Sequence, residues 1–140
     1  MQNSNATDTN LVWGAVVVAA GRGTRLGRPK QLLEVGGMPL VGWCLRTFAG
    51  MPEIAHVAIV AEPDALEAMK DLAARIFSTT PFAVVAGGAT RQASVANGLD
   101  ALPDMCSAVL VHDGARPLLR AGDVLAGMAK VGPGRAAIVA

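Results

Sequence analysis

An apolar run leads directly into a glycine-rich, basic segment near the start of the chain, in the stretch Val16-Val17-Val18-Ala19-Ala20-Gly21-Arg22-Gly23-Thr24-Arg25-Leu26-Gly27-Arg28-Pro29-Lys30. β-Branched residues in succession, without alternating polar residues, are typical of a strand that is buried on both faces of a sheet. The glycines that follow let the backbone approach a ligand and direct successive N–H groups toward it. This stretch therefore predicts a buried strand that ends in a ligand-binding loop.

The same alternation continues along the chain. Four further apolar runs predict strands at residues 57–60, 82–85, 109–111 and 137–139. Apolar residues at helical spacing predict helices from Leu40, Asp64 and Thr90, and a short fourth helix over residues 123–130. Asp64 and Glu67 have the spacing of a capping box. Strands that alternate with helices predict an α/β fold, with a Rossmann-like, mostly parallel sheet and helices on both faces.

Composition and charge narrow the classes of protein. Of the 140 residues, 52% are hydrophobic and 16% are charged, which favours one folded domain and excludes intrinsic disorder. The net charge of +1 gives no reason to expect nucleic acid or a membrane as a partner. The first 21 residues contain no Lys or Arg, which argues against a secretory signal peptide. We therefore expect a cytoplasmic protein in which Cys44 and Cys106 are free thiols.

The domain organisation is simple. We expect a polar, disordered leader over residues 1–12 and a single α/β domain over residues 13–140. The final residues, 138–140, have the composition of the middle of a strand. We therefore expect the domain to be incomplete at its C-terminus.

The basic segment predicts an anion-binding site. Four cations lie within nine residues of the chain, with no acid between them: Arg22, Arg25, Arg28 and Lys30. Like charges gathered on one loop call for an anion, and a polyphosphate fits. The segment is no P-loop, because no Gly-Lys pair is followed by Ser or Thr. It is also no dinucleotide fingerprint, because Leu26 stands at the third glycine position and the ribose-binding acid is missing.

Two further segments follow predicted strands, where parallel sheets bind their ligands. After residues 82–85, the backbone at Gly87 and Gly88 can read the edge of a base, and Ser94 can hydrogen-bond the same ligand. A turn with a helix cap is the alternative explanation of this segment.

The third segment follows residues 109–111. A carboxylate at a strand end beside a polyphosphate can bind Mg²⁺ or a ribose hydroxyl, which makes Asp113 the metal candidate. A turn-forming Asp-Gly pair at Asp113 and Gly114 is the alternative. We expect His112 to make a structural hydrogen bond rather than to act as a general base.

Together, these three segments resemble the 2-C-methyl-D-erythritol 4-phosphate cytidylyltransferase family. The resemblance rests on residues 18–31, on Gly87-Gly88 with Arg91 and Ser94, and on residues 111–117, and it extends from about Gly14 to Ala140. It implies a sheet of the nucleotide-diphospho-sugar transferase type. It also implies that CTP and 2-C-methyl-D-erythritol 4-phosphate give 4-diphosphocytidyl-2-C-methyl-D-erythritol and pyrophosphate, with Mg²⁺, in isoprenoid biosynthesis by the non-mevalonate pathway.

The resemblance also implies roles for particular residues. Arg25 and Lys30 would be catalytic, stabilising the pentacoordinate phosphorus and the leaving pyrophosphate. The CTP site would be lined by Ala19, Ala20, Gly21 and Gly23. Gly88 and Ser94 would recognise cytosine, and Asp113 and Gly114 would meet the ribose and the metal. Full-length members would be homodimers, whose acceptor-binding part follows residue 140.

Three other functions stay open. The chain resembles, in its first motif alone, nucleotidyltransferases that act on another sugar phosphate or on a molybdopterin-type acceptor. A CTP-binding module without turnover is a second possibility, since the acceptor part of the family is not in these 140 residues. A dehydrogenase-like dinucleotide domain is disfavoured by Leu26 and the missing ribose acid.

Overall fold

The computed structural model describes residues 11–21 and 30–132. In chain order, the elements are β1 (Trp13–Ala19), the short 3-10 helix η3 (Lys30–Leu32), β2 (Glu34–Val35), β3 (Met38–Pro39), α1 (Leu40–Ala49), β4 (Ile54–Ala61), the 3-10 helix η4 (Pro63–Ala65), α2 (Leu66–Ile76), β5 (Phe82–Ala86), α3 (Arg91–Ala101), β6 (Ala108–Asp113) and α4 (Ala121–Met128).

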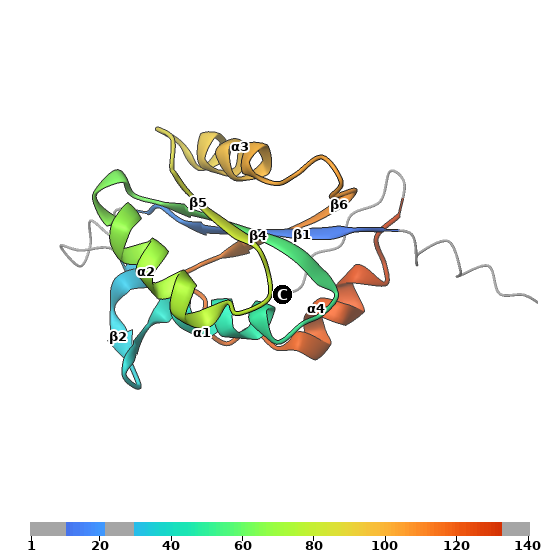
Figure 1. Ribbon diagram of the computed structural model, residues 1–140, viewed down its shortest axis with the longest axis horizontal. Coiled ribbons are helices and arrows are strands. Elements are labelled where there is room, and N and C mark those ends of the chain that lie inside the picture. Colours follow the sequence, from blue (N-terminus) through green and yellow to red (C-terminus); the bar gives the residue numbers. More distant parts are fainter. Residues whose placement is uncertain (1–10, 22–29, 133–140) are drawn as a thin grey trace, which may run out of the picture.

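The four long strands form one parallel sheet in the order β5-β4-β1-β6. Strand β1 is central, and all seven of its residues are buried, as its unbroken apolar run predicts. Figure 1 shows α3 on one face of this sheet and α1, α2 and α4 on the other. The predicted α/β fold with helices on both faces is therefore confirmed.

The predicted elements match the structure closely, with one error. The four apolar runs within the described residues all lie inside strands, whereas the run at 137–139 lies outside the described residues. The predicted capping box at Asp64 and Glu67 is wrong. Pro63 starts the 3-10 helix η4, so Asp64 lies inside that turn, and α2 is preceded by Ala65 with no side-chain cap. Glu67 instead pairs with Lys70, at 3.3 Å.

The hairpin of β2 and β3 was not predicted from the sequence. Gly36 and Gly37 form its turn with φ of 64° and 84°, a conformation that favours glycine. The indole Nε1 of Trp43 donates a hydrogen bond to the carbonyl of Val35 at 2.8 Å, which ties the hairpin to α1. None of the helices in the described ranges is long and apolar enough to cross a bilayer.

The chain before β1 is already held by the domain. The N–H of Val12 donates to the Ser107 hydroxyl at 2.9 Å, and the carbonyl of Val12 accepts from Ser107 and Ala108. Leu11 packs against the core. These two residues, which the sequence analysis assigned to the leader 1–12, are therefore part of the fold; residues 1–10 lie outside the described residues.

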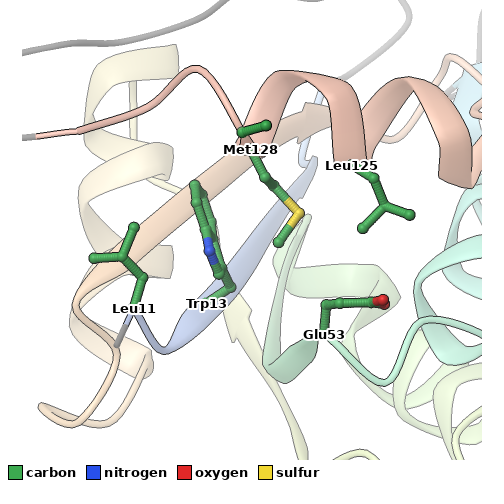
Figure 2. A pocket seen from close by; sticks show the side chains of 6 residues that line it. Leu11, Trp13, Glu53, Leu125 and Met128 are labelled. Carbon is green, nitrogen blue, oxygen red and sulfur yellow. The ribbon is translucent and has the colours of Figure 1, made fainter. Parts of the chain in front are cut away.

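A groove of about 320 Å³ lies at the amino edge of the sheet. Its lining consists of Leu11, Trp13, Glu53, Leu125, Met128 and Ala129. Figure 2 shows Met128 reaching down from α4 between Trp13 and Leu125. The groove is therefore at the opposite end of the strands from the segments that the sequence predicts to bind ligand.

Candidate functional site

The described parts of the three predicted ligand segments lie together at the carboxyl edge of the sheet. Strand register places Ala19 beside Ala61, and Ala61 beside Ala86 on β5. The next residues continue this pairing, because Gly87 donates its N–H to Ala61 at 2.9 Å and Gly114 donates to Val18 at 2.8 Å. The ends of β1, β5 and β6 thus form one continuous edge.

Close packing at this edge explains two of the glycines. A Cβ on Gly87 would stand 2.5 Å from the Cβ of Ala20 and 2.9 Å from the Ser94 hydroxyl. A Cβ on Gly114 would stand 3.1 Å from the Cβ of Ala19. Larger residues at either position would push the loops apart, so the small residues bring the three backbones together.

Helix α3 is held against this edge by polar contacts. Thr90 caps the helix, since its Oγ1 accepts from the N–H of Ala93 at 3.0 Å. Ser94 is only 3% exposed, and its Oγ accepts from the N–H of Gly88 at 3.1 Å. Asn97 donates to the Ala86 carbonyl at 3.1 Å. Ser94 therefore fixes the backbone of Gly88, and Gly88 itself is exposed.

The turn after β6 is ordered around Asp113. The carboxylate Oδ1 accepts from the N–H of Ala115 at 3.0 Å, and the Asp113 carbonyl accepts from Arg116. His112 Nε2 lies 2.9 Å from the Arg116 carbonyl, so this nitrogen carries the proton and donates it, because a carbonyl can only accept. The His112 ring meets Phe48 edge-on at 6.0 Å. The predicted structural role of His112 is confirmed.

Asp113 meets a simple test as a ligand for Mg²⁺. Its side chain is half-buried, and among the described residues no group bonds to its second oxygen, Oδ2. No group of three His, Cys, Asp or Glu residues gathers around a metal position in the described ranges. Mg²⁺ commonly binds through one or two carboxylates together with substrate phosphates, so a single carboxylate at this edge suits that ion.

A buried cysteine lies near Asp113. Burial raises the pKa of the Cys44 thiol to about 12, and the negative charge of Asp113 contributes in the same direction. Cys44 Sγ donates to the Val41 carbonyl at 3.1 Å within α1. The thiol is thus neutral at physiological pH and is unsuited to act as a nucleophile at this site.

One residue at the site was not predicted. Gln31 is 4% exposed, and its Nε2 donates to the carbonyl of Ala19 at 2.6 Å and to that of Gly21 at 2.8 Å. It joins the end of β1 to η3, across the basic segment. A lone glutamine after Pro29-Lys30 carries no periodic or compositional signal, so nothing in the sequence pattern alone indicates that it is buried.

The structure places some of the predicted site residues and not others. Those that it brings together at the carboxyl edge are Ala19, Ala20, Gly21, Gly88, Ser94, Asp113 and Gly114. Gly23 and Arg25 lie outside the described residues. For Lys30, the structure describes the backbone alone, at the start of η3. The arrangement joins exposed backbone and one carboxylate at a single edge, which suits an anionic nucleotide with a bound cation.

Comparison with known proteins decides the family. The model of the family IspD, 2-C-methyl-D-erythritol 4-phosphate cytidylyltransferase, matches residues 13–140. The chain belongs to this family. The resemblance drawn from the three sequence segments is therefore confirmed, and the cytidylyltransferase family accounts for the α/β fold.

Individual relatives give the extent of the match. The 2-C-methyl-D-erythritol 4-phosphate cytidylyltransferase of Streptomyces coelicolor is 45% identical over 129 residues, covering 89% of this chain and 48% of the relative. The bifunctional enzyme IspD/IspF of Solidesulfovibrio magneticus is 44% identical over 133 residues, covering 89% of this chain and 33% of the relative.

A solved structure agrees with these relatives. The 4-diphosphocytidyl-2C-methyl-D-erythritol synthase of Anaerococcus prevotii superposes with a TM-score of 0.76 at 30% identity, over 89% of this chain and 52% of that one. The chain thus spans about half the length, or less, of the relatives that it matches.

Proposed function

We propose that this chain is the nucleotide-binding part of an enzyme that converts CTP and 2-C-methyl-D-erythritol 4-phosphate to 4-diphosphocytidyl-2-C-methyl-D-erythritol and pyrophosphate. The observation that carries the proposal is that the described parts of the three family segments lie together at one edge of the sheet. Gly87 bonds to Ala61 and Gly114 bonds to Val18 there, and a Cβ on Gly87 or Gly114 would crowd Ala20 or Ala19. Membership of the cytidylyltransferase family supports the choice of substrates.

The chemistry needs no nucleophile from the protein. An oxygen of the acceptor phosphate attacks the α-phosphorus of CTP, and the bond between this phosphorus and the oxygen that bridges to the β-phosphate breaks. Pyrophosphate leaves with that pair of electrons. The protein therefore acts by positioning the two phosphates and by stabilising the charge that develops between them. Arg25 and Lys30 supply cations in this proposal.

The remaining site residues are assigned to different parts of CTP: the triphosphate, the cytosine base, and the ribose with its metal ion. Ala19, Ala20, Gly21 and Gly23 would line the triphosphate side, where backbone N–H groups suit an anion. Gly88 and Ser94 would recognise cytosine together, with the exposed Gly88 backbone facing the base and the buried Ser94 hydroxyl holding Gly88 in place. Asp113 would hold Mg²⁺, with Gly114 beside the ribose, and the ion when bound would neutralise charge on the phosphates.

Two measurements test the function. In a thermal-shift series, CTP should raise the melting temperature, and GTP, UTP and dTTP should not. Protection by another nucleotide instead would point to a transferase with a different substrate. Release of pyrophosphate from CTP and 2-C-methyl-D-erythritol 4-phosphate then separates an enzyme from a binding module. The module is a CTP-binding domain that does not turn CTP over. It is the outcome if CTP protects and no pyrophosphate appears.

The two cations have their own test. In a chain of the relatives' full length, Lys30→Ala or Arg25→Ala should lower turnover on the order of 10²–10³-fold, by analogy with the removal of one transition-state donor. The melting temperature should barely move, since the proposed role of these two cations is to bind phosphate rather than to stabilise the fold. Lys70→Ala is the matched control, because Lys70 pairs with Glu67 on α2, away from the carboxyl edge. Near-normal turnover in Lys30→Ala would overturn its assignment.

Two further properties are proposed on the family resemblance alone. Full-length members would form homodimers, and the protein would act in the cytoplasm. Sedimentation velocity of a full-length member tests the first, and fractionation of cells tests the second.

A further inference from the structure

Gln31 and Ser94 are the buried polar side chains of the described residues, and each holds a loop at the carboxyl edge. Ser94 accepts from Gly88, as described above. Gln31 uses both hydrogens of one amide nitrogen, which donate to the carbonyls of Ala19 and Gly21. We call this pair of hydrogen bonds the Gln31 clamp.

The Gln31 clamp fixes the direction of a backbone donor. Each peptide unit is planar and trans, so the carbonyl of one residue and the N–H of the next point in opposite directions. With the Ala19 carbonyl bound to Gln31, the N–H of Ala20 must point away from Gln31. In residues 11–21 and 30–132, this N–H donates to no acceptor. Ala20 itself is half-buried, so an amide in that position gains from a ligand that accepts.

The clamp also removes two unfavourable groups from the site. A carbonyl oxygen that faced an incoming polyphosphate would repel it, because the negative end of the carbonyl dipole would meet the negative charge of the phosphates. The Ala19 and Gly21 carbonyls are both directed to the Gln31 amide instead. The end of β1 is therefore arranged as a donor before any anion arrives, which lowers the cost of ordering it on binding.

We propose that Gln31 is a positioning residue for the triphosphate of CTP, and that it acts by orienting the backbone from Ala19 to Gly21. The inference rests on the proposed function, because it assumes that CTP binds at this edge. Gln31 itself does not touch the nucleotide in this proposal. Its effect passes through the Ala20 amide, which donates to a phosphate oxygen when the clamp is intact.

The test compares Gln31→Met, which keeps the length of the side chain and loses the donor, with Thr47→Val. Thr47 lies near the end of α1, and its hydroxyl is 3.0 Å from the Leu119 carbonyl and 3.3 Å from the Trp43 carbonyl, so its variant likewise loses side-chain hydrogen bonding to the backbone, at a place away from the carboxyl edge. Calorimetric titration with CTP should give a Kd about tenfold higher for Gln31→Met, in proportion to the loss of a typical hydrogen bond. The Kd of Thr47→Val should stay within twofold of the wild type.

A spectroscopic measurement distinguishes positioning from general destabilisation. On addition of CTP, the amide proton of Ala20 should move downfield in the wild type and in Thr47→Val, and should move little in Gln31→Met. If Gln31→Met does not fold, the test is instead the rate of hydrogen exchange of the Gln31 side-chain amide in the wild type. Slow exchange supports the clamp, and exchange at the rate of a free glutamine amide overturns it.

Different results would overturn the proposed function and the positioning role of Gln31. A wild-type chain that shows no binding of CTP would overturn the proposed function, and the role of Gln31 with it. A wild type that binds CTP, together with a Gln31→Met variant that binds within twofold and keeps the Ala20 shift, would overturn the positioning role alone.

Discussion

The two faces of the sheet are built in different ways. Among the described residues, the face covered by α1, α2 and α4 (the thick face) buries twenty residues in one cluster, whereas the face under α3 (the thin face) buries five. On the thin face, α3 lies close to the strands through Gly98. Ser94 and Asn97 bond it to the end of β5 and the loop that follows, and Thr90 caps the helix itself. Most hydrophobic stabilisation therefore comes from the thick face, and the thin face holds residues of the candidate site.

The largest effect is expected on the thick face. Phe48 is 1% exposed on α1, and Phe48→Ala should lower the free energy of unfolding by about 3–5 kcal/mol, because it removes a large buried side chain and leaves a cavity. Urea denaturation measures the change. The control is Leu99→Ala on α3, where the side chain is 42% exposed and the loss should be less than about 1 kcal/mol. Equal losses in the two variants would contradict the contrast between the faces.

The close approach of α3 gives the next effect. A Cβ on Gly98 would stand 2.5 Å from Cγ1 of Val16 and 2.9 Å from Cγ2 of Val60, both in buried strands. Gly98→Ala should therefore destabilise the protein by about 1–3 kcal/mol, despite the better helix propensity of alanine.

The matched control is the same substitution on the other face. Gly122 lies in α4, and nothing is within 4 Å of a Cβ placed there. Gly122→Ala should raise the free energy of unfolding by up to about 1 kcal/mol. If thermal unfolding shows that Gly98→Ala is also stabilising, α3 does not rely on close contact with the sheet.

A smaller effect is expected at the start of α3. Thr90→Ala removes the acceptor for the N–H of Ala93 and should cost about 1 kcal/mol, which is typical for the loss of a helix cap. Thr79→Ala, at an exposed residue before β5, should change stability by less than about 0.5 kcal/mol. Chemical denaturation of both variants checks the pair. A Thr90 variant as stable as the Thr79 variant would show that the cap contributes nothing to this face.

The same contrast explains what could be predicted from the sequence. Strands buried on both faces need continuous apolar runs. The strands at residues 16–18 and 57–60 could therefore be predicted from the local sequence, without knowing which strands pair with them. The loops at the carboxyl edge were recognisable as well, because Gly87 and Asp113 follow such runs directly. Family membership and the parallel sheet both follow from these local patterns.

What escaped prediction depends on contacts between distant residues. The strands of the hairpin have two residues each, too few to show a period, although the pair Gly36-Gly37 is a turn signal. The spacing of Asp64 and Glu67 suggested a cap, but the 3-10 turn at Pro63 moved the start of the helix. The burial of Gln31 depends on the Ala19 and Gly21 carbonyls, ten to twelve residues away. No local pattern records such a contact.

The smallest effect concerns the two cysteines, one on each face. Cys44 belongs to the cluster of the thick face and is fully buried, whereas Cys106 is half-buried beside the α3 cluster. Burial raises the pKa of Cys44 to about 12 and raises that of Cys106 as well. A disulfide reagent at pH 8 should therefore label Cys106 slowly and Cys44 hardly at all, and both should react in urea.

Stability should follow the Cys44 thiol at alkaline pH. Its pKa in the folded chain, about 12, is above the ordinary value of 9.0, so folding favours the protonated form. The contribution is fully present below pH 9 and is lost as pH rises toward 12, since only the unfolded chain ionises this thiol easily. Urea denaturation of the wild type and of Cys44→Ala over this range isolates the effect, because the variant lacks the titrating group. Two results would contradict this view: free energies of unfolding that change in parallel with pH in the two proteins, or labelling of native Cys44 as fast as that of Cys106. Either one would mean that solvent reaches the core of the thick face as easily as that of the thin face.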